Sequence, residues 1–161
     1  MMCVYTACDR ENNLGGCDLY VRYYNKKGSW SEEYNLGINV NSKAWETQAS
    51  FSADGRYLYF ISNRKGGFGG DDIWRSEITN KGFMPAVNLG SDINTNYNEM
   101  SPFLHPDNQT LYFSSNGHIG MGGYDIYISR RKTSVDDWSY PKNIGYPINT
   151  YNSEKYKKGK K

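Results

Sequence analysis

The chain repeats itself, and this internal repeat limits the fold more than any other feature of the sequence. The stretch LYFISNRKGGFGGDDIW at 58–74 returns 53 residues later as LYFSSNGHIGMGGYDIY at 111–127. A weaker copy, VYTACDRENNLGGCDLY, lies 54 residues earlier at 4–20. Similarity at a nearly fixed period indicates an array of equivalent structural units, each packed on its neighbours.

The repeat register also sets the expected boundaries of the units. Each copy is followed by a segment that begins NLG or NIG and ends in Asn-Ser or Asn-Thr, and Glu46, Glu99 and Glu154 then open the next cycle. The chain is therefore expected to divide into 1–48, which lacks its first strand, 49–100, 101–152, and 153–161, which is a basic tail or the start of a truncated fourth repeat.

Each repeat reads as a set of β-strands. RYLYFIS at 56–62 and QTLYFSS at 109–115 each have an alternating residue pattern and carry aromatic and β-branched residues, as strands do. Asp-Gly or Asp-Asn precedes each of them, which indicates a tight hairpin turn. DIWRSEI at 72–78 and DIYISRR at 125–131 are the strands that follow the glycine-rich loops.

Two weaker segments complete the expected repeat. SKAWETQA at 42–49 has some helical propensity, but its counterpart at 94–102 contains Asn and Pro, so an extended strand is expected at both places. A short fourth strand is expected around 84–87. About four strands per cycle at near-constant spacing predicts an all-β chain of β-propeller blades with mostly antiparallel strands. Because propellers typically have about four to eight blades, about three blades predict a partial propeller, or one completed by a second copy in a homodimer.

The residues at the centre of the third copy resemble a known repeat family. They follow the order Pro-Asp, Leu-Tyr-Phe, Ser-Asn, Gly-Gly and Asp-Ile-Tyr, carried here by Pro106, Asp107, Leu111, Tyr112, Phe113, Ser115, Asn116, Gly122, Gly123, Asp125, Ile126 and Tyr127. This pattern is similar to the TolB-like, WD-like Pro-Asp β-propeller repeats. The first copy departs from it at Asn13 and Cys17, and no peptidoglycan-binding segment accompanies the repeats.

The resemblance implies a location and a role. Proteins with such repeats belong to the envelope of Gram-negative bacteria, where they are periplasmic or associated with the outer membrane. The Gly-Gly variants most resemble copies found beside outer-membrane-protein-A-like domains, and some of those proteins are scaffolds of larger assemblies. A non-catalytic scaffold is therefore expected, with other envelope proteins or peptidoglycan-associated molecules as partners. A carbohydrate-binding or glycoside-processing propeller is the alternative, because a glycosidase needs only two suitably spaced carboxylates.

The loop RKGGFGGDDIW at 64–74 could cradle a phosphate, hold a cation or form a plain turn. Phosphate-binding glycine loops open a helix, whereas this one runs into aspartate and a strand. A cation site could draw on Asp71 and Asp72, but one carboxylate alone recurs, as Asp18, Asp72 and Asp125. We therefore expect these three aspartates to accept hydrogen bonds from loop N–H groups, with glycines supplying positive φ, and no metal or cofactor.

Residues that do not recur are the candidates for contact with a partner or ligand. They are Arg22, Tyr23 and Tyr24 in the first repeat, and Arg64, Lys65 and Asp71 in the second. The aromatic residues Trp30, Phe83 and Trp138 share one repeat position, so they are expected to pack within their units. No nucleophile elbow, zinc-protease pair or cysteine–histidine setting is visible, and no catalytic residue is predicted.

Cysteines and histidines add little to this prediction. Cys3, Cys8 and Cys17 lack the paired spacing of a zinc site, so free, half-buried thiols are favoured, with one disulfide as the alternative. His105 and His118 are expected to be solvent-exposed or locally hydrogen-bonded.

The ends of the chain and its hydropathy bear on location and on charged partners. No apolar run approaches the length of a membrane span, and MMCVYTACDR does not read as a signal peptide. The stretch 155–161 holds five of the 19 Lys and Arg residues and reads as a solvated end rather than a nucleic-acid site.

Overall fold

The computed structural model describes residues 1–133 and 137–153, and this part of the chain is built from β-strands. The strands are β1 (Met2–Cys8), β2 (Cys17–Tyr23), β3 (Tyr34–Asn35), β4 (Glu46–Phe51), β5 (Tyr57–Ser62), β6 (Asp72–Thr79), β7 (Gly82–Phe83), β8 (Val87–Asn88), β9 (Glu99–Leu104), β10 (Thr110–Ser115), β11 (Asp125–Arg130) and β12 (Lys142–Asn143). The prediction of an all-β fold is confirmed. None of the described residues belongs to a helix long and apolar enough to cross a membrane.

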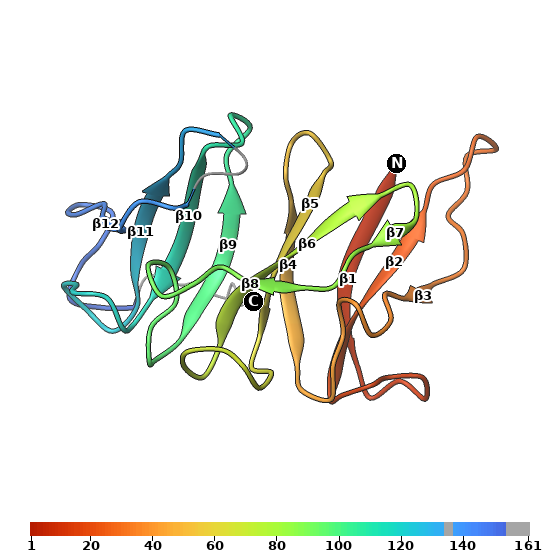
Figure 1. Ribbon diagram of the computed structural model, residues 1–161, viewed down its shortest axis with the longest axis horizontal. Coiled ribbons are helices and arrows are strands. Elements are labelled where there is room, and N and C mark those ends of the chain that lie inside the picture. Colours follow the sequence, from red (N-terminus) through yellow and green to blue (C-terminus); the bar gives the residue numbers. More distant parts are fainter. Residues whose placement is uncertain (134–136, 154–161) are drawn as a thin grey trace, which may run out of the picture.

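The strands form three antiparallel sheets that lie side by side along the molecule (Figure 1). The first sheet contains β1, β2 and β3, the second contains β4 to β8, and the third contains β9 to β12. Each sheet has a long hairpin at its centre, β1–β2, β5–β6 or β10–β11, in which residue pairs face each other without a break. The strands that follow each hairpin are only two residues long: β3 in the first sheet, β7 and β8 in the second, and β12 in the third.

Two of the expected strand positions are wrong in detail. The short fourth strand was expected around 84–87, whereas β8 begins at Val87 and pairs Asn88 with Trp74. The segments expected to be extended from 42 and 94 form bends first, and their strands begin only at Glu46 and Glu99. The bends arise because the side chains of Glu46 and Glu99 accept hydrogen bonds from the backbone amides of Ser42 and Thr95.

The second sheet is buried on both faces. In β5, Tyr57, Tyr59 and Ile61 belong to the core shared with the third sheet, whereas Leu58 and Phe60 belong to the core shared with the first. Alternating side chains of a strand point to opposite faces, so one strand supplies both cores. Every residue of β5 is therefore buried.

The three aromatic residues expected to pack within their units behave differently. Trp138 is buried in the core between the second and third sheets, and Phe83 packs against the core between the first and second. Trp30 is 41% exposed and its ring packs edge-on against Tyr24, so the prediction is wrong for this residue. The first sheet has no neighbour on that side to cover it within the described residues.

The first repeat differs from the other two by one residue in its loop. Across the hairpins, Phe60 faces Trp74 and Phe113 faces Tyr127, but Tyr20, the counterpart of these aromatic residues, faces Tyr5. The sequence alignment matches Tyr5 with Tyr59, whereas in the hairpin register the counterpart of Tyr5 is the next residue, Phe60. Because side chains alternate between faces, this extra loop residue moves the aromatic side chain of Tyr5 to the face that Phe60 occupies in the second sheet.

The turn between β9 and β10 holds an aspartate with a depressed pKa. Asp107 is desolvated to a small degree, which raises its pKa, but hydrogen bonds from the Gln109 and Thr110 amides outweigh this and lower it to about 2. The charged form is thus favoured in the folded chain, and its contribution is present above the ordinary pKa of 3.8 and is lost as the pH falls toward about 2.

An Asp107→Asn variant should therefore lose less stability than the wild type between pH 3.8 and about 2. Urea denaturation at a series of pH values measures this. Asp92→Asn, which changes an exposed aspartate, is the control for loss of any carboxylate. Equal pH dependence of the wild type and Asp107→Asn would contradict the prediction.

Candidate functional site

The glycine-rich loops end in an aspartate whose side chain closes the loop from inside. Asp72 accepts hydrogen bonds from the amides of Phe68 (2.6 Å) and Gly69 (3.1 Å). Asp18 does the same for Leu14 and Gly15, and Asp125 for Met121 and Gly122. All three aspartates are buried. This is the acceptor role that the repeat pattern predicts, and it leaves the loops no free carboxylate pointing outward at this position.

A buried asparagine continues the same network in each repeat. Asn94 accepts a hydrogen bond from the Ile73 amide at 2.8 Å and donates one to the Ile73 carbonyl at 3.0 Å, so its side chain pairs with the strand as a backbone would. It also donates to Asn88, which in turn donates to Asp72 at 2.8 Å. Asn41 and Asn149 make the same paired contacts with Leu19 and Ile126. The NLG to INT stretch is thus tied to the strand after the loop.

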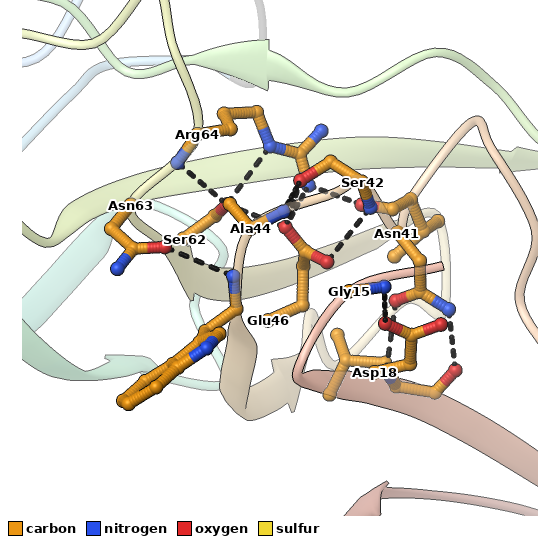
Figure 2. Close-up of polar contacts among 12 residues, drawn as sticks. Gly15, Asp18, Asn41, Ser42, Ala44, Glu46, Ser62, Asn63 and Arg64 are labelled. Carbon is orange, nitrogen blue, oxygen red and sulfur yellow. Dashed lines mark hydrogen bonds and ion pairs between the residues drawn. The ribbon is translucent and has the colours of Figure 1, made fainter. Parts of the chain in front are cut away.

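A buried glutamate joins each repeat to the next. Glu46, at the start of β4, accepts hydrogen bonds from the amide and hydroxyl of Ser42 at 2.8 and 2.7 Å. It also accepts a hydrogen bond from the Ser62 hydroxyl of β5 at 2.6 Å and pairs with the Arg64 guanidinium at 3.1 Å. Figure 2 shows these contacts converging on the Glu46 carboxylate, beside the Asp18 loop of the first repeat.

The corresponding glutamate of the third sheet has a histidine nearby in place of the arginine. Glu99 accepts hydrogen bonds from the amide and hydroxyl of Thr95 and from the Ser115 hydroxyl. Burial raises the pKa of Glu99, while these hydrogen bonds and the charge of His118 oppose the rise. Both Glu46 and Glu99 are fully buried, so these carboxylates are part of the fold rather than of an open site.

Arg64 and His118 each donate a hydrogen bond to a backbone carbonyl, and their positions within the repeat differ by one residue. Arg64 donates from Nη2 to the Val40 carbonyl, and His118 donates from Nε2 to the Ile93 carbonyl at 2.9 Å. Val40 and Ile93 are themselves repeat counterparts, each just before the buried asparagine. The expectation of a local or exposed role is wrong for His118, whose partner lies 25 residues away. His105 is exposed and lies 3.1 Å from Asp107, as expected.

The paired glycines are required by close approach rather than by positive φ. A Cβ on Gly69 would lie 2.7 Å from the carbonyl carbon of Asn96 and closer still to the Thr95 and Tyr97 oxygens. Gly15 and Gly122 meet the backbone of the following turn in the same way. Of the glycines in the three loops, Gly66 alone has a positive φ. The expected role of these glycines was therefore wrong, since they let each loop touch the turn that leads into the next sheet.

Two of the non-recurring residues of the second loop take part in this junction. Burial and the neighbouring Asp72 carboxylate raise the pKa of Asp71, whose amide donates to Asn98 and whose carbonyl accepts from the Glu99 amide at 2.7 Å. The Arg64 guanidinium lies over the rings of Phe60 and Trp74, 5.2 and 5.0 Å from their centroids. Lys65 is exposed and lines a pocket of about 540 Å³ with Lys43 and Ala44.

The candidates of the first repeat lie on its surface. Tyr23 and Tyr24 are exposed at the end of β2, and Arg22 donates from Nε to the Ser31 carbonyl at 2.9 Å. Tyr34 lies beside Tyr23 and Trp30 packs edge-on against Tyr24, with ring centroids 6.5 and 5.1 Å apart. These are two ring pairs at one end of the first sheet, and we refer to Tyr23, Tyr24, Trp30 and Tyr34 together as the aromatic patch. Its two later members were not predicted, because loop length hides their proximity in the sequence.

Cys8 and Cys17 form a disulfide, so the favoured reading of free thiols is wrong for this pair. The two residues face each other across the β1–β2 hairpin. Cys3 is free and exposed. Within the described ranges, no three His, Cys, Asp or Glu residues are grouped so that they could hold a metal ion.

The site as a whole joins adjacent sheets. Its aspartates and asparagines tie each glycine-rich loop to the stretch that follows it, and its glutamates and glycines fix the turn that leads into the next sheet. No family model matches the chain, and no curated protein is similar to it at a significant level.

Proposed function

We propose that this chain is a three-blade segment of a β-propeller that acts as a non-catalytic interaction scaffold in the bacterial envelope. The observation that carries the proposal is the use of the recurring polar residues. Asp18, Asp72, Glu46 and Glu99 are buried and hydrogen-bonded at the loops and junctions. The recurring residues thus stabilise the fold, and the residues left to contact a partner are surface residues that do not recur.

The arrangement of the sheets supports the propeller. Consecutive sheets pack face to face through two cores, and the first strands β4 and β9 lie next to each other at the junction. The two strands also share a backbone irregularity, because Gln48 and Ser101 have positive φ at equivalent positions and are joined by a 2.6 Å hydrogen bond. Adjacent first strands are what radially arranged blades require around a common axis.

The aromatic patch supports an interaction role. Its members are 41–54% exposed although each is large and apolar. Tyrosine and tryptophan supply much of the energy of protein interfaces because they bury a large area at little entropic cost. Exposed Arg22, Lys26 and Lys27 provide a polar rim at the same end of the first sheet.

The disulfide supports the envelope location. Disulfides persist in oxidising compartments such as the bacterial periplasm and are rare where thiols are kept reduced. The Cys8–Cys17 pair is in line with the periplasmic or outer-membrane-associated location that the repeat resemblance implies.

Co-sedimentation with purified peptidoglycan sacculi, and cross-linking to proteins of a washed outer-membrane fraction, test the role. We expect saturable binding that Tyr23→Ala/Tyr24→Ala reduces about tenfold or more. Tyr146→Ala/Tyr151→Ala, which removes two tyrosines with 79% and 84% exposure from the third repeat, is the matched control. Equal binding by both double variants would contradict an interaction role for the patch.

A carbohydrate-processing propeller is the second candidate, and the exposed aromatic rings favour it because sugars stack on such rings. Glycan arrays and turnover of chromogenic glycosides separate the two. Specific binding of a soluble glycan that is lost in Tyr23→Ala/Tyr24→Ala, or any turnover above background, would replace the scaffold proposal.

A further inference from the structure

The outer face of the third sheet is apolar and partly exposed. Phe103, Tyr112, Ile126 and Ile128 share this face, because Tyr112 lies opposite both Phe103 and Ile128 in the register. The rings of Phe103 and Tyr112 are 6.4 Å apart, and Phe103 is 53% exposed. The three other side chains are only partly covered.

The same face is covered in the other two sheets. Tyr59 and Ile73, the counterparts of Tyr112 and Ile126, have no exposed surface because the third sheet packs on them. Leu19, the counterpart in the first sheet, is equally buried under the second sheet. In every junction within the chain, this face is therefore covered by the sheet of the next repeat.

The first sheet offers the complementary face. Cys3, Tyr5, Tyr20 and Arg22 share the face that points away from the second sheet. In register they correspond to Leu58, Phe60, Trp74 and Ser76, and the first three of these residues pack on the preceding sheet. Cys3 and Arg22 are exposed here, whereas Leu58 and Ser76 are buried, and Tyr20 has no exposed surface because its own loop covers it.

We propose that the outer face of the third sheet in one copy docks onto the outer face of the first sheet in a second copy of this chain. The contact repeats the packing already present at the two internal junctions. Because it joins unlike faces, two copies related by a twofold axis form two such contacts and close a ring of six sheets. The inference rests on the propeller architecture proposed above and names its partner.

Light scattering and sedimentation equilibrium on the purified chain measure the association. We expect a species of twice the 18.5 kDa chain mass. Phe103→Glu, which changes a residue that the monomer leaves half exposed, should weaken dimerisation about 100-fold by placing a charge in the contact. Ile119→Glu adds the same charge at a 91% exposed position in a loop and should leave the dimer intact.

The free thiol reports on the other half of the contact. Cys3 lies on the proposed docking face and Cys8 and Cys17 are paired, so a thiol reagent reads one position. Its reaction rate should fall as the wild-type dimer forms and stay high in Phe103→Glu at the same concentration.

Mixing two blocked variants decides the direction of the contact. Phe103→Glu blocks one face and Cys3→Glu the other, so an equimolar mixture retains one intact junction and should form a heterodimer that neither variant forms alone as a homodimer. A monomer at every soluble concentration, a dimer insensitive to Phe103→Glu, or no heterodimer on mixing would overturn the inference. Trp30 is the repeat counterpart of Phe83, which packs in an internal junction, so the dimer would cover this part of the aromatic patch. Partner binding through the patch is therefore measured separately with the monomeric Phe103→Glu, and failure of the dimer does not decide the scaffold role.

Discussion

Glu46→Ala is expected to lower the free energy of unfolding by about 3–5 kcal/mol, because it leaves the Arg64 guanidinium, which is only 13% exposed, without its carboxylate. The loss also removes the acceptor of three further hydrogen bonds, from Ser42 and Ser62. Urea or guanidinium denaturation followed by tryptophan fluorescence measures the change. Glu77→Ala, which breaks an exposed pair with Arg56, should cost less than about 1 kcal/mol and is the control.

A double-mutant cycle shows how much of the loss belongs to the ion pair. Arg64→Met removes the cation but keeps an apolar side chain over Phe60 and Trp74. If the unpaired guanidinium is the main cost, Glu46→Ala/Arg64→Met is more stable than Glu46→Ala alone. Equal losses for Glu46→Ala and Glu77→Ala would show that the junction does not depend on this carboxylate.

Gly69→Ala is expected to destabilise the chain by about 3 kcal/mol, because the added methyl group meets the backbone of Thr95, Asn96 and Tyr97. The turn that it meets carries the Thr95–Glu99 contacts, so it cannot move away without breaking them. Gly122→Ala should behave alike against Thr150 and Asn152. Thermal and chemical denaturation measure both.

Gly66→Ala in the same loop separates the two roles of glycine. Gly66 has open space around its Cβ position but a φ of 94°, so its substitution should cost about 1–2 kcal/mol of backbone strain. If Gly66→Ala proved worse than Gly69→Ala, positive φ rather than close approach would be the main reason for glycine in these loops.

The recurring aspartates show what a repeat can predict. Asp18, Asp72 and Asp125 keep their place while their neighbours change, and an aspartate between glycines and a strand has few roles other than accepting loop amides. The glutamates were recognised as landmarks but not as acceptors, because their partners Ser62 and Ser115 come from a different strand. Pairing across a sheet is not visible in one strand's sequence.

The exchange of Arg64 for His118 could not have been predicted. The repeat alignment matches Arg64 with Gly117, and His118 with Lys65, so the two side chains look unrelated. Their side chains reach equivalent carbonyls, those of Val40 and Ile93, from adjacent positions. The different lengths of the arginine and histidine side chains offset the shift of one residue. A sequence alignment does not describe how far a side chain extends.

The pairing of the cysteines also could not be predicted from the sequence. Three cysteines within 17 residues allow three pairings, and spacing does not choose between them. The hairpin register places Cys8 opposite Cys17 and leaves Cys3 across from Arg22. The extra residue in the first loop sets this register, and the weaker similarity of the first copy had concealed it.

The sequence by itself determined the all-β class, the period, the central hairpins and the recurring loop aspartates, because these follow from alternation, turn residues and self-similarity along one chain. The tertiary structure alone decided which residues join the sheets. The Glu46–Arg64 pair, the closely approached Gly69 and the two-sided burial of β5 each depend on segments brought together across repeats. Such contacts arise from sheet-on-sheet packing, which has no counterpart in local sequence pattern.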